Sequence, residues 1–392
     1  MPFLKLAGNL AIVAFNKNIY FVNKTTNWSY KVDLNAPPEK GHPRKYFDAD
    51  SGSEEDVCKL QDHQNKEINE EKINIVSAEV HETILAVSTS DKSLLLYESE
   101  DFSKAGSLKL LSRRFVARTT SCMKFAGSGE FIVVCDKGGD CYAYDCKDFT
   151  KPGQWLFGHM SQVLDVLINP DESLIITSER DEKIRVTRCP ESHNIETFCL
   201  GHTEFVSHLE FLATSNCSLL LSLSGDKTLR VWEYKTGKEL FRKELKLPGT
   251  KLTTKLLHDG STLAVVLCYK PNTLAVYRII IKDTFRCEFI QKLNTAPNIV
   301  LSTITFDNHF NLLALTIEED TSIVALKMYD FDQEKNIFNI DYVDYPSETF
   351  VSCLKDERLP YVDSVSFLFK KKFDNIKDYH ERKRKRCEEN SK

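Results

Sequence analysis

Long apolar runs and C-x-x-C cysteine pairs are missing from this 392-residue sequence. No apolar run approaches the roughly 18–20 residues that span a bilayer, so we expect no membrane-spanning helix. Met1–Lys5 shows no charged segment before a long apolar stretch, and we expect no secretory signal. The 12 cysteines include no C-x-x-C pair. We therefore expect reduced, buried thiols, most densely at Cys135, Cys141 and Cys146.

The motifs that carry catalytic chemistry are missing as well. The glycines of Gly127–Gly129 and Gly138–Gly139 lie in expected hairpins, not between a strand and a helix, so they do not form a phosphate cradle. The ten histidines show no H-E-x-x-H spacing, and no G-x-S-x-G elbow is present. We expect no catalytic residue, no metal site and no cofactor on this chain.

Composition and length indicate a globular protein built as one large repeat fold or two ordinary domains. Hydrophobic residues make up 42% and charged residues 28% of the chain. The formal net charge of −5 argues against a general nucleic-acid coat protein, and local basic patches remain open.

A repeat of about 45 residues organises the chain. The Gly-His pairs ending at His159 and His202 lie 43 residues apart (202 − 159). The turn aspartates Asp181 and Asp226 lie 45 apart (226 − 181), and each opens a tight turn between two apolar strands. A Gly-His start and a Trp-Asp-like end, here Trp232-Glu233, at about 40–45 residues are typical of WD repeats.

The same phase extends along most of the chain. Steps of 45 connect the strand-end positions Tyr97, Tyr142, Thr187, Trp232 and Tyr277. In the third repeat, the strand-end position could be Tyr144 instead of Tyr142. Further hairpins at 10–21 and 312–329 bring the count to seven.

We therefore predict an all-β fold, a seven-bladed WD-repeat β-propeller over residues 1–369. Phe3–Leu6 and Val365–Phe369 are candidate strands near the seam of the ring. Residues 36–73, rich in Pro, Gly and acidic side chains, are predicted to form a disordered insertion. Ser51 and Ser53 in it are either phosphorylation sites or part of a solvated spacer. Residues 370–392 are predicted to form a basic C-terminal helix or tail.

Two constellations resemble catalytic sets but fit a structural network better. His202, Ser222, Asp226 and Trp232 occupy positions that hydrogen-bond to one another in WD blades, and buried polar groups must be paired. The neighbouring blade repeats the pattern with His159, Thr177 and Asp181, but has Thr187 in the Trp position. A hydrolase interpretation would require an exposed, reactive Ser222.

Two charged segments remain. The turn region Arg180, Asp181, Glu182, Lys183 and Arg185 suits either a salt-sensitive protein partner or an ordinary solvated turn. In the tail, an apolar stripe (Phe373, Ile376, Tyr379) precedes the cationic run 382–386. Such a run is typical of nuclear localisation or nucleic-acid contact, with a merely solvated tail as the alternative.

A longer stretch resembles a known family. Residues 180–186 and 192–207, including the string Ile195–Ser207, are similar to the Wuho-type WD-repeat non-catalytic subunits of tRNA (guanine-N7-)-methyltransferase. The similarity is strongest over residues 157–240. The segment Phe373–Asn375 and the basic tail resemble the C-terminal end of that family.

The resemblance implies a heterodimer in which a separate subunit binds S-adenosylmethionine and methylates a guanosine in the tRNA variable loop. This chain would stabilise that subunit and help to position tRNA. The resemblance places the subunit interface at Arg180, Asp181, Glu182, Lys183 and Arg185. The candidates for contact with tRNA phosphates are Lys370, Lys371, Lys372, Arg382, Lys383, Arg384, Lys385 and Arg386.

A second hypothesis is a general nuclear WD-repeat scaffold that recruits several protein partners. Under either hypothesis we expect the protein in the nucleus, with the cytoplasm as an additional location.

Overall fold

The structure is a computed structural model of the chain. It describes residues 2–7, 10–23, 28–34, 46–47, 73–104, 106–212, 219–281, 284–339, 341–344, 358–370 and 383–384. The chain divides into two units, Met1–Val362 and Asp363–Lys392, and each is considered by itself.

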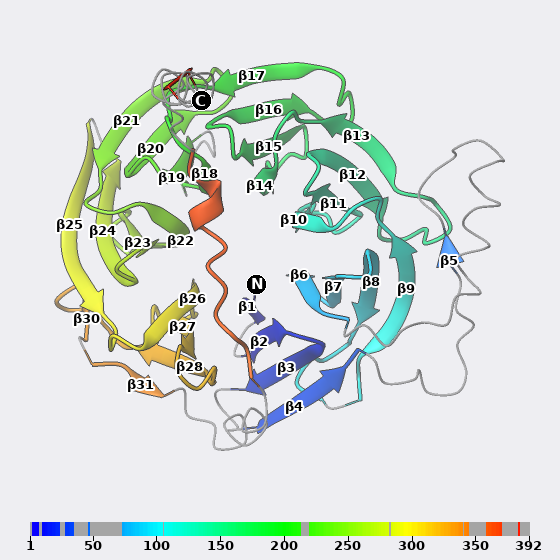
Figure 1. The fold of residues 1–392 in the computed structure, drawn as a ribbon, viewed down its shortest axis with the longest axis horizontal. Coiled ribbons are helices and arrows are strands. Elements are labelled where there is room, and N and C mark those ends of the chain that lie inside the picture. The colour runs from blue at the N-terminus through cyan, green and yellow to red at the C-terminus, as the bar shows by residue number, and fades with distance from the viewer. Residues whose placement is uncertain are drawn as a thin grey trace, which may run out of the picture. The chain divides into compact units, whose positions relative to one another are not determined.

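The first unit is a ring of seven antiparallel blades, counted over the described residues (Figure 1). Blade 1 contains β1 (Phe3–Ala7), β2 (Leu10–Phe15), β3 (Asn18–Asn23) and β4 (Trp28–Asp33). Blade 2 contains β6 (Ile75–His81), β7 (Ile84–Thr89), β8 (Ser93–Glu98) and β9 (Lys109–Phe115). Blade 3 contains β10 (Thr120–Phe125), β11 (Phe131–Asp136), β12 (Asp140–Asp145) and β13 (Gln154–Gly158). Blade 4 contains β14 (Val163–Ile168), β15 (Leu174–Glu179), β16 (Ile184–Arg188) and β17 (Ile195–Cys199). Blade 5 contains β18 (Val206–Phe211), β19 (Leu219–Ser224), β20 (Thr228–Glu233) and β21 (Lys238–Glu244). Blade 6 contains β22 (Gly249–Leu256), β23 (Thr262–Cys268), β24 (Thr273–Ile281) and β25 (Phe285–Asn294). Blade 7 contains β26 (Ile299–Phe306), β27 (Leu312–Glu318), β28 (Val324–Tyr329) and β31 (Val343–Asp344).

Three short strands add to this frame. β5 (Tyr46–Phe47) pairs in parallel with β9, and β29 (Phe331–Asp332) forms a hairpin with β30 (Ile337–Phe338). The all-β, seven-bladed prediction is confirmed.

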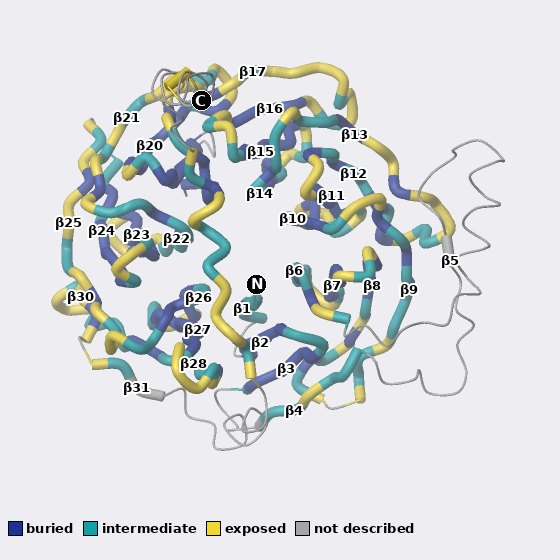
Figure 2. Tube along the Cα trace, in the orientation of Figure 1, coloured by how far each residue is buried: buried dark blue, intermediate teal, exposed yellow. Residues whose placement is uncertain are grey.

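Burial follows the position of a strand in its blade (Figure 2). Every residue of β2, β15, β19 and β23 is buried. Each is the second strand of its blade, and its apolar run is covered on both faces. The outer strands, such as β21 and β25, carry mostly exposed or half-buried residues.

Strand register assigns the repeat positions. Trp232 pairs with Leu220, and Tyr144 pairs in the same way with Ile132, six residues after the turn centre. Tyr144 is fully buried, whereas Tyr142 is half-buried. Tyr144 therefore occupies the repeat position of the third blade, as the alternative assignment predicts.

The ring closes by packing between its first and last blades. Phe3–Ala7 is a strand, as expected, and β1 contacts β26 of blade 7. Arg358 O accepts a hydrogen bond from the Asn16 side chain (3.1 Å), and Leu359 N–H donates to Ser322 O (3.0 Å). The chain before Val362 thus ties a turn of blade 1 to a turn of blade 7.

The expected strand at Val365–Phe369 is wrong. Ser366–Leu368 forms the short 3₁₀ helix η1 in the second unit. Because blade 1 uses only N-terminal strands and blade 7 only C-terminal strands, each is already complete within the described residues and needs no strand from the other end.

Most of the predicted insertion and tail lie outside the described residues. Within 36–73 the structure describes only residues 46–47 and 73, and in the tail only Lys370, Lys383 and Arg384. Lys383 and Arg384 have helical backbone geometry. Over the described part of the chain, no helix has the length and apolar character needed to cross a membrane.

Candidate partner-binding site

Blade 5 contains a buried polar chain built from four strand and turn residues. Trp232 Nε1–H donates to Ser222 Oγ (2.7 Å), and Ser222 Oγ lies 2.7 Å from His202 Nε2. His202 Nδ1 lies 2.9 Å from Asp226 Oδ2. A continuous relay results if Ser222 donates to a neutral His202, which in turn donates to Asp226.

The electrostatics agree with this arrangement. Burial lowers the pKa of His202, which favours the neutral ring. Burial also acts to raise the pKa of Asp226, but hydrogen bonds from His202, Thr228 and the Thr203 amide outweigh it and hold that pKa below its usual range. Ser222 is 0% exposed. It is therefore a structural hydroxyl, because no substrate can reach it.

Blade 4 builds a variant of this network with a different acid. His159 Nε2 lies 3.0 Å from Thr177 Oγ1, and its Nδ1 lies 3.0 Å from Glu179 Oε1. Asp181, expected in this network, is exposed in the turn instead. Glu179 takes its place because its longer side chain reaches the ring from inside the strand.

The charged turn, residues Arg180–Lys183, connects β15 to β16. Glu179 N–H donates to Lys183 O (3.0 Å), and Arg180 N–H donates to Gln162 O in the preceding loop (2.9 Å). Glu182 holds a left-handed backbone with φ of 66°. Asp181 and Lys183 are exposed and Arg180 and Glu182 are half-buried. The turn thus presents opposite charges on a backbone fixed at both ends.

Arg185 lies inside the blade, not on the surface as expected. It is 9% exposed, and its guanidinium lies 4.6 Å from the centroid of the Phe157 ring. Its Nη1 donates to Gly158 O (3.1 Å). Burial lowers the pKa of Arg185. On a strand, position 185 faces the neighbouring element, and the charge pattern alone did not show this.

Sequence reasoning also missed two exposed apolar side chains beside this region. Met160 is 99% exposed and follows His159 directly, and Trp155 on β13 is 57% exposed. His159 contacts Thr177 and Glu179 at the base of the charged turn. The signal in the sequence is an apolar residue directly after a Gly-His pair, where the connection between blades reaches the surface.

The predicted tRNA-contact residues fall in the second unit or outside the described residues. Lys370, Lys383 and Arg384 are exposed. Lys371, Lys372, Arg382, Lys385 and Arg386 lie outside the described part of the chain.

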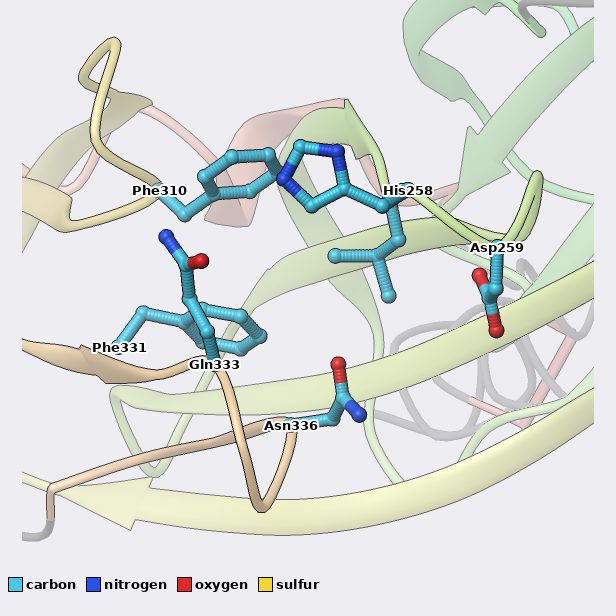
Figure 3. A pocket seen from close by; sticks show the side chains of 7 residues that line it. His258, Asp259, Phe310, Phe331, Gln333 and Asn336 are labelled. Carbon is cyan, nitrogen blue, oxygen red and sulfur yellow. The ribbon is translucent and has the colours of Figure 1, made fainter.

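One small cavity opens among loops of blades 6 and 7 (Figure 3). It measures about 190 Å³ and is lined by Leu257, His258, Asp259, Phe310, Phe331, Gln333 and Asn336. Across the described residues, no group of His, Cys, Asp and Glu side chains is arranged to hold a metal ion. The eight cysteines that the structure describes are free thiols, and Cys135, Cys141 and Cys146 are buried, as predicted.

The ring of blades and the His–Ser–Asp–Trp network define a WD-repeat β-propeller. A chain in the crystal structure of a mitotic checkpoint complex shares this fold, with a TM-score of 0.59 over 80% of this chain and 84% of that chain, at 14% identity.

Sequence comparisons give the particular family. The family described as "tRNA methyltransferase TRM82 WD40 domain" matches residues 22–152 and 146–353. The "tRNA (guanine-N(7)-)-methyltransferase non-catalytic subunit wuho" of Culex quinquefasciatus is 53% identical over 100% of this chain and 98% of its own length. That of Aedes aegypti is also 53% identical over the same shares, and that of Drosophila melanogaster is 37% identical over 78% of this chain and 72% of its own length. The chain belongs to this family of WD-repeat non-catalytic subunits, which confirms the resemblance.

Proposed function

We propose that this chain is the non-catalytic subunit of a heterodimeric tRNA (guanine-N7-)-methyltransferase. Its relatives carry that name over its full length. Within the heterodimer, the chain stabilises the catalytic subunit and helps to position tRNA for formation of N7-methylguanosine in the variable loop. S-adenosylmethionine binds to the catalytic subunit, not to this chain.

The observation that supports a docking role is the charged turn. Asp181 and Lys183 extend from a backbone that is fixed by hydrogen bonds to Gln162 and within the turn itself. A pre-ordered turn loses little conformational entropy when a partner docks. Its two opposite charges select a partner surface with the complementary pattern and reject one with the reversed pattern.

Exposed apolar side chains extend this docking surface. Met160 lies next to His159, which contacts the base of the turn. Charges steer the partner and set its orientation, whereas burial of an exposed side chain of this size contributes affinity. We propose that Asp181 and Lys183, together with Met160, form the contact with the catalytic subunit, and that Arg185 supports the turn from inside.

Contact with tRNA is proposed for the basic residues of the second unit. Lys370, Lys383 and Arg384 are exposed, and phosphate neutralisation by such side chains depends on salt. The same basic segment supports nuclear import of the chain.

The decisive experiment measures methyl transfer from S-adenosylmethionine to tRNA. The chain, the catalytic subunit and the mixture are each assayed, and the mixture is repeated with the double variant Asp181→Lys and Lys183→Glu. We expect activity only in the wild-type mixture, and a loss of at least about tenfold in subunit affinity for the variant, since tenfold corresponds to about 1.4 kcal/mol.

Lys92→Glu is the matched control, since Lys92 is exposed in the corresponding turn of blade 2. It should leave both activity and affinity unchanged. If the catalytic subunit alone were as active as the mixture, the proposal would fail. Recovery of a varied set of partners with no single stoichiometric subunit would then favour the general scaffold.

A further inference from the structure

Blade 3 holds three cysteines on three adjacent strands. Cys122 on β10 pairs in register with Cys135 on β11, and Cys135 pairs in register with Cys141 on β12. The Sγ atoms of Cys135 and Cys141 lie 2.6 Å apart. All three side chains are buried, and the chain forms no disulfide among the described cysteines.

The backbone around Cys135 and Cys141 suits a covalent bond between them. Directly opposed residues in an antiparallel pair have Cα atoms about 4.5–5.5 Å apart, and disulfides form at about 4.4–6.8 Å. A disulfide has an S–S length of about 2.05 Å, so the two sulfur atoms must close by only about half an ångström.

We propose that Cys135 and Cys141 are a redox-active dithiol that forms a cross-strand disulfide when the protein meets a peroxide. The proposal does not depend on the function inferred above. It rests on the register of β11 and β12, on the distance between the sulfur atoms and on the position of His159.

His159 is a polar residue that lies beside the turn between the two cysteines. Gly139, in the turn between Cys135 and Cys141, has φ of 105°, and a Cβ there would lie 2.5 Å from the His159 carbonyl oxygen. The His159 loop therefore packs directly on this turn and brings His159 close to Cys141.

The two thiols are electrostatically distinct. Burial acts to raise the pKa of Cys141, but hydrogen bonds from Cys135 and His159 outweigh it and lower that pKa. Burial and the neighbouring thiols raise the pKa of Cys135. The directions of these two pKa shifts favour Cys141 over Cys135 as the thiol that attacks a peroxide.

The chemistry balances in two steps. The Cys141 thiolate attacks one peroxide oxygen, which breaks the O–O bond, gives a sulfenic acid and releases hydroxide. Cys135 sulfur then attacks the Cys141 sulfur, forms the S–S bond and expels a second hydroxide. Protons from the two thiols convert both hydroxides to water, so two thiols are oxidised and one peroxide is reduced. Lys137 and Gly138 at the turn are exposed, so local opening of the turn admits a small oxidant.

Tryptic mapping tests this directly, because Lys124 and Lys137 separate the three cysteines into different peptides. The folded full-length protein is treated with millimolar hydrogen peroxide, remaining thiols are alkylated, and the digest is analysed without reduction. We expect peptide 125–137 linked to peptide 138–147, a loss of two hydrogen masses from the intact protein, and reversal by dithiothreitol.

Variants identify the sulfur atoms. Cys146→Ser should keep the link, although Cys146 shares the second peptide, and Cys122→Ser should keep it as well. Cys141→Ser should abolish it, and circular dichroism checks that this variant is folded. A link between the peptides of Cys122 and Cys135, or free thiols at both positions after peroxide treatment, would overturn the proposal.

Discussion

At the scale of single residues, the polar groups of this propeller act as internal supports. In blade 5 the Ser222 hydroxyl accepts a hydrogen bond from the Trp232 N–H and contacts His202, so two side chains depend on it. In blade 4 Glu179 replaces the expected turn aspartate, which leaves Asp181 available to the surface. In blade 4, therefore, the contact between Glu179 and His159 leaves the turn aspartate exposed on the surface.

We predict that Ser222→Ala lowers the free energy of unfolding by about 1–3 kcal/mol, because it leaves the Trp232 N–H and a His202 nitrogen buried without a partner. Urea denaturation followed by tryptophan fluorescence measures the change. Ser128→Ala, at an exposed serine that hydrogen-bonds to Glu172, is the control and should cost less than about 0.5 kcal/mol. Equal effects of the two variants would contradict the supporting role of Ser222.

Substitutions of Arg185 and Lys183 should differ in their effect on the free energy of unfolding. Arg185→Ala removes a hydrogen bond to Gly158 O and the stacking on Phe157, so we expect a loss of about 1–3 kcal/mol in unfolding free energy. Lys183→Ala, at an exposed position two residues away, should change stability by less than about 0.5 kcal/mol. Thermal and urea unfolding of the two variants provide the comparison, and a stable Arg185→Ala protein would count against the internal role.

At the scale of elements, the inner strands of successive blades line the axis of the ring (Figure 1), and ion pairs connect some of them. Glu79 on β6 pairs with Lys5 on β1 (3.3 Å) and with Lys124 on β10 (2.9 Å). Asp165 on β14 pairs with His208 on β18 (3.0 Å). These pairs connect strands of different blades, which the backbone hydrogen bonds within each blade cannot do.

Asp165 makes one of these links sensitive to acid. Burial acts to raise its pKa, but the charge and hydrogen bond of His208, together with the charge of Lys251 and the hydrogen bond from the Leu209 amide, lower the pKa from its usual 3.8 to about 2. The resulting stabilisation is present above about pH 4 and is lost as the pH falls towards 2, because the unfolded chain takes up the proton first.

We therefore predict that Asp165→Asn lowers the stability at neutral pH by roughly 2 kcal/mol, the equivalent of the pKa shift. The difference from the wild type should shrink as the pH falls from about 4 towards 2. Urea unfolding across this range measures it. Asp320→Asn, on an exposed turn, is the control. A difference between Asp165→Asn and the wild type that did not depend on pH would exclude this ion pair as its source.

At the scale of the whole molecule, the closed ring depends on an apolar seal between its two ends. Side chains of blade 1, including Leu4 and Val13, share one buried cluster with side chains of blade 7, including Leu313 and Leu326. The segment with Arg358 and Leu359 adds hydrogen bonds to both blades. The blade sheets themselves do not cross this seam.

We predict that Leu4→Ala and Leu326→Ala each lower the free energy of unfolding by about 2–5 kcal/mol, because each leaves a cavity in the seal. The double variant should differ from the sum of the single losses by at least about 0.5 kcal/mol, since both residues belong to one cluster. Val362→Ala, at an exposed position, is the control. Strict additivity in urea unfolding would show that the two ends of the ring are energetically independent.

The amino-acid sequence by itself determined the elements and their period. Alternation of apolar residues, the Gly-His pairs and the turn aspartates are local patterns, and local patterns decide where strands and turns form. They were enough to predict seven blades, the polar network of Trp232 and the buried thiols. The family, too, was readable from the string Ile195–Ser207.

Only the tertiary structure decided which side chains meet across blades. The burial of Arg185 on Phe157, the choice of Glu179 over Asp181, the closure of the ring without an exchanged strand and the approach of Cys135 to Cys141 and His159 all depend on contacts between separate strands or blades. Such contacts follow from how neighbouring sheets pack and twist against each other. The residue pattern of a single strand does not predict which side chains of another strand or blade it will contact.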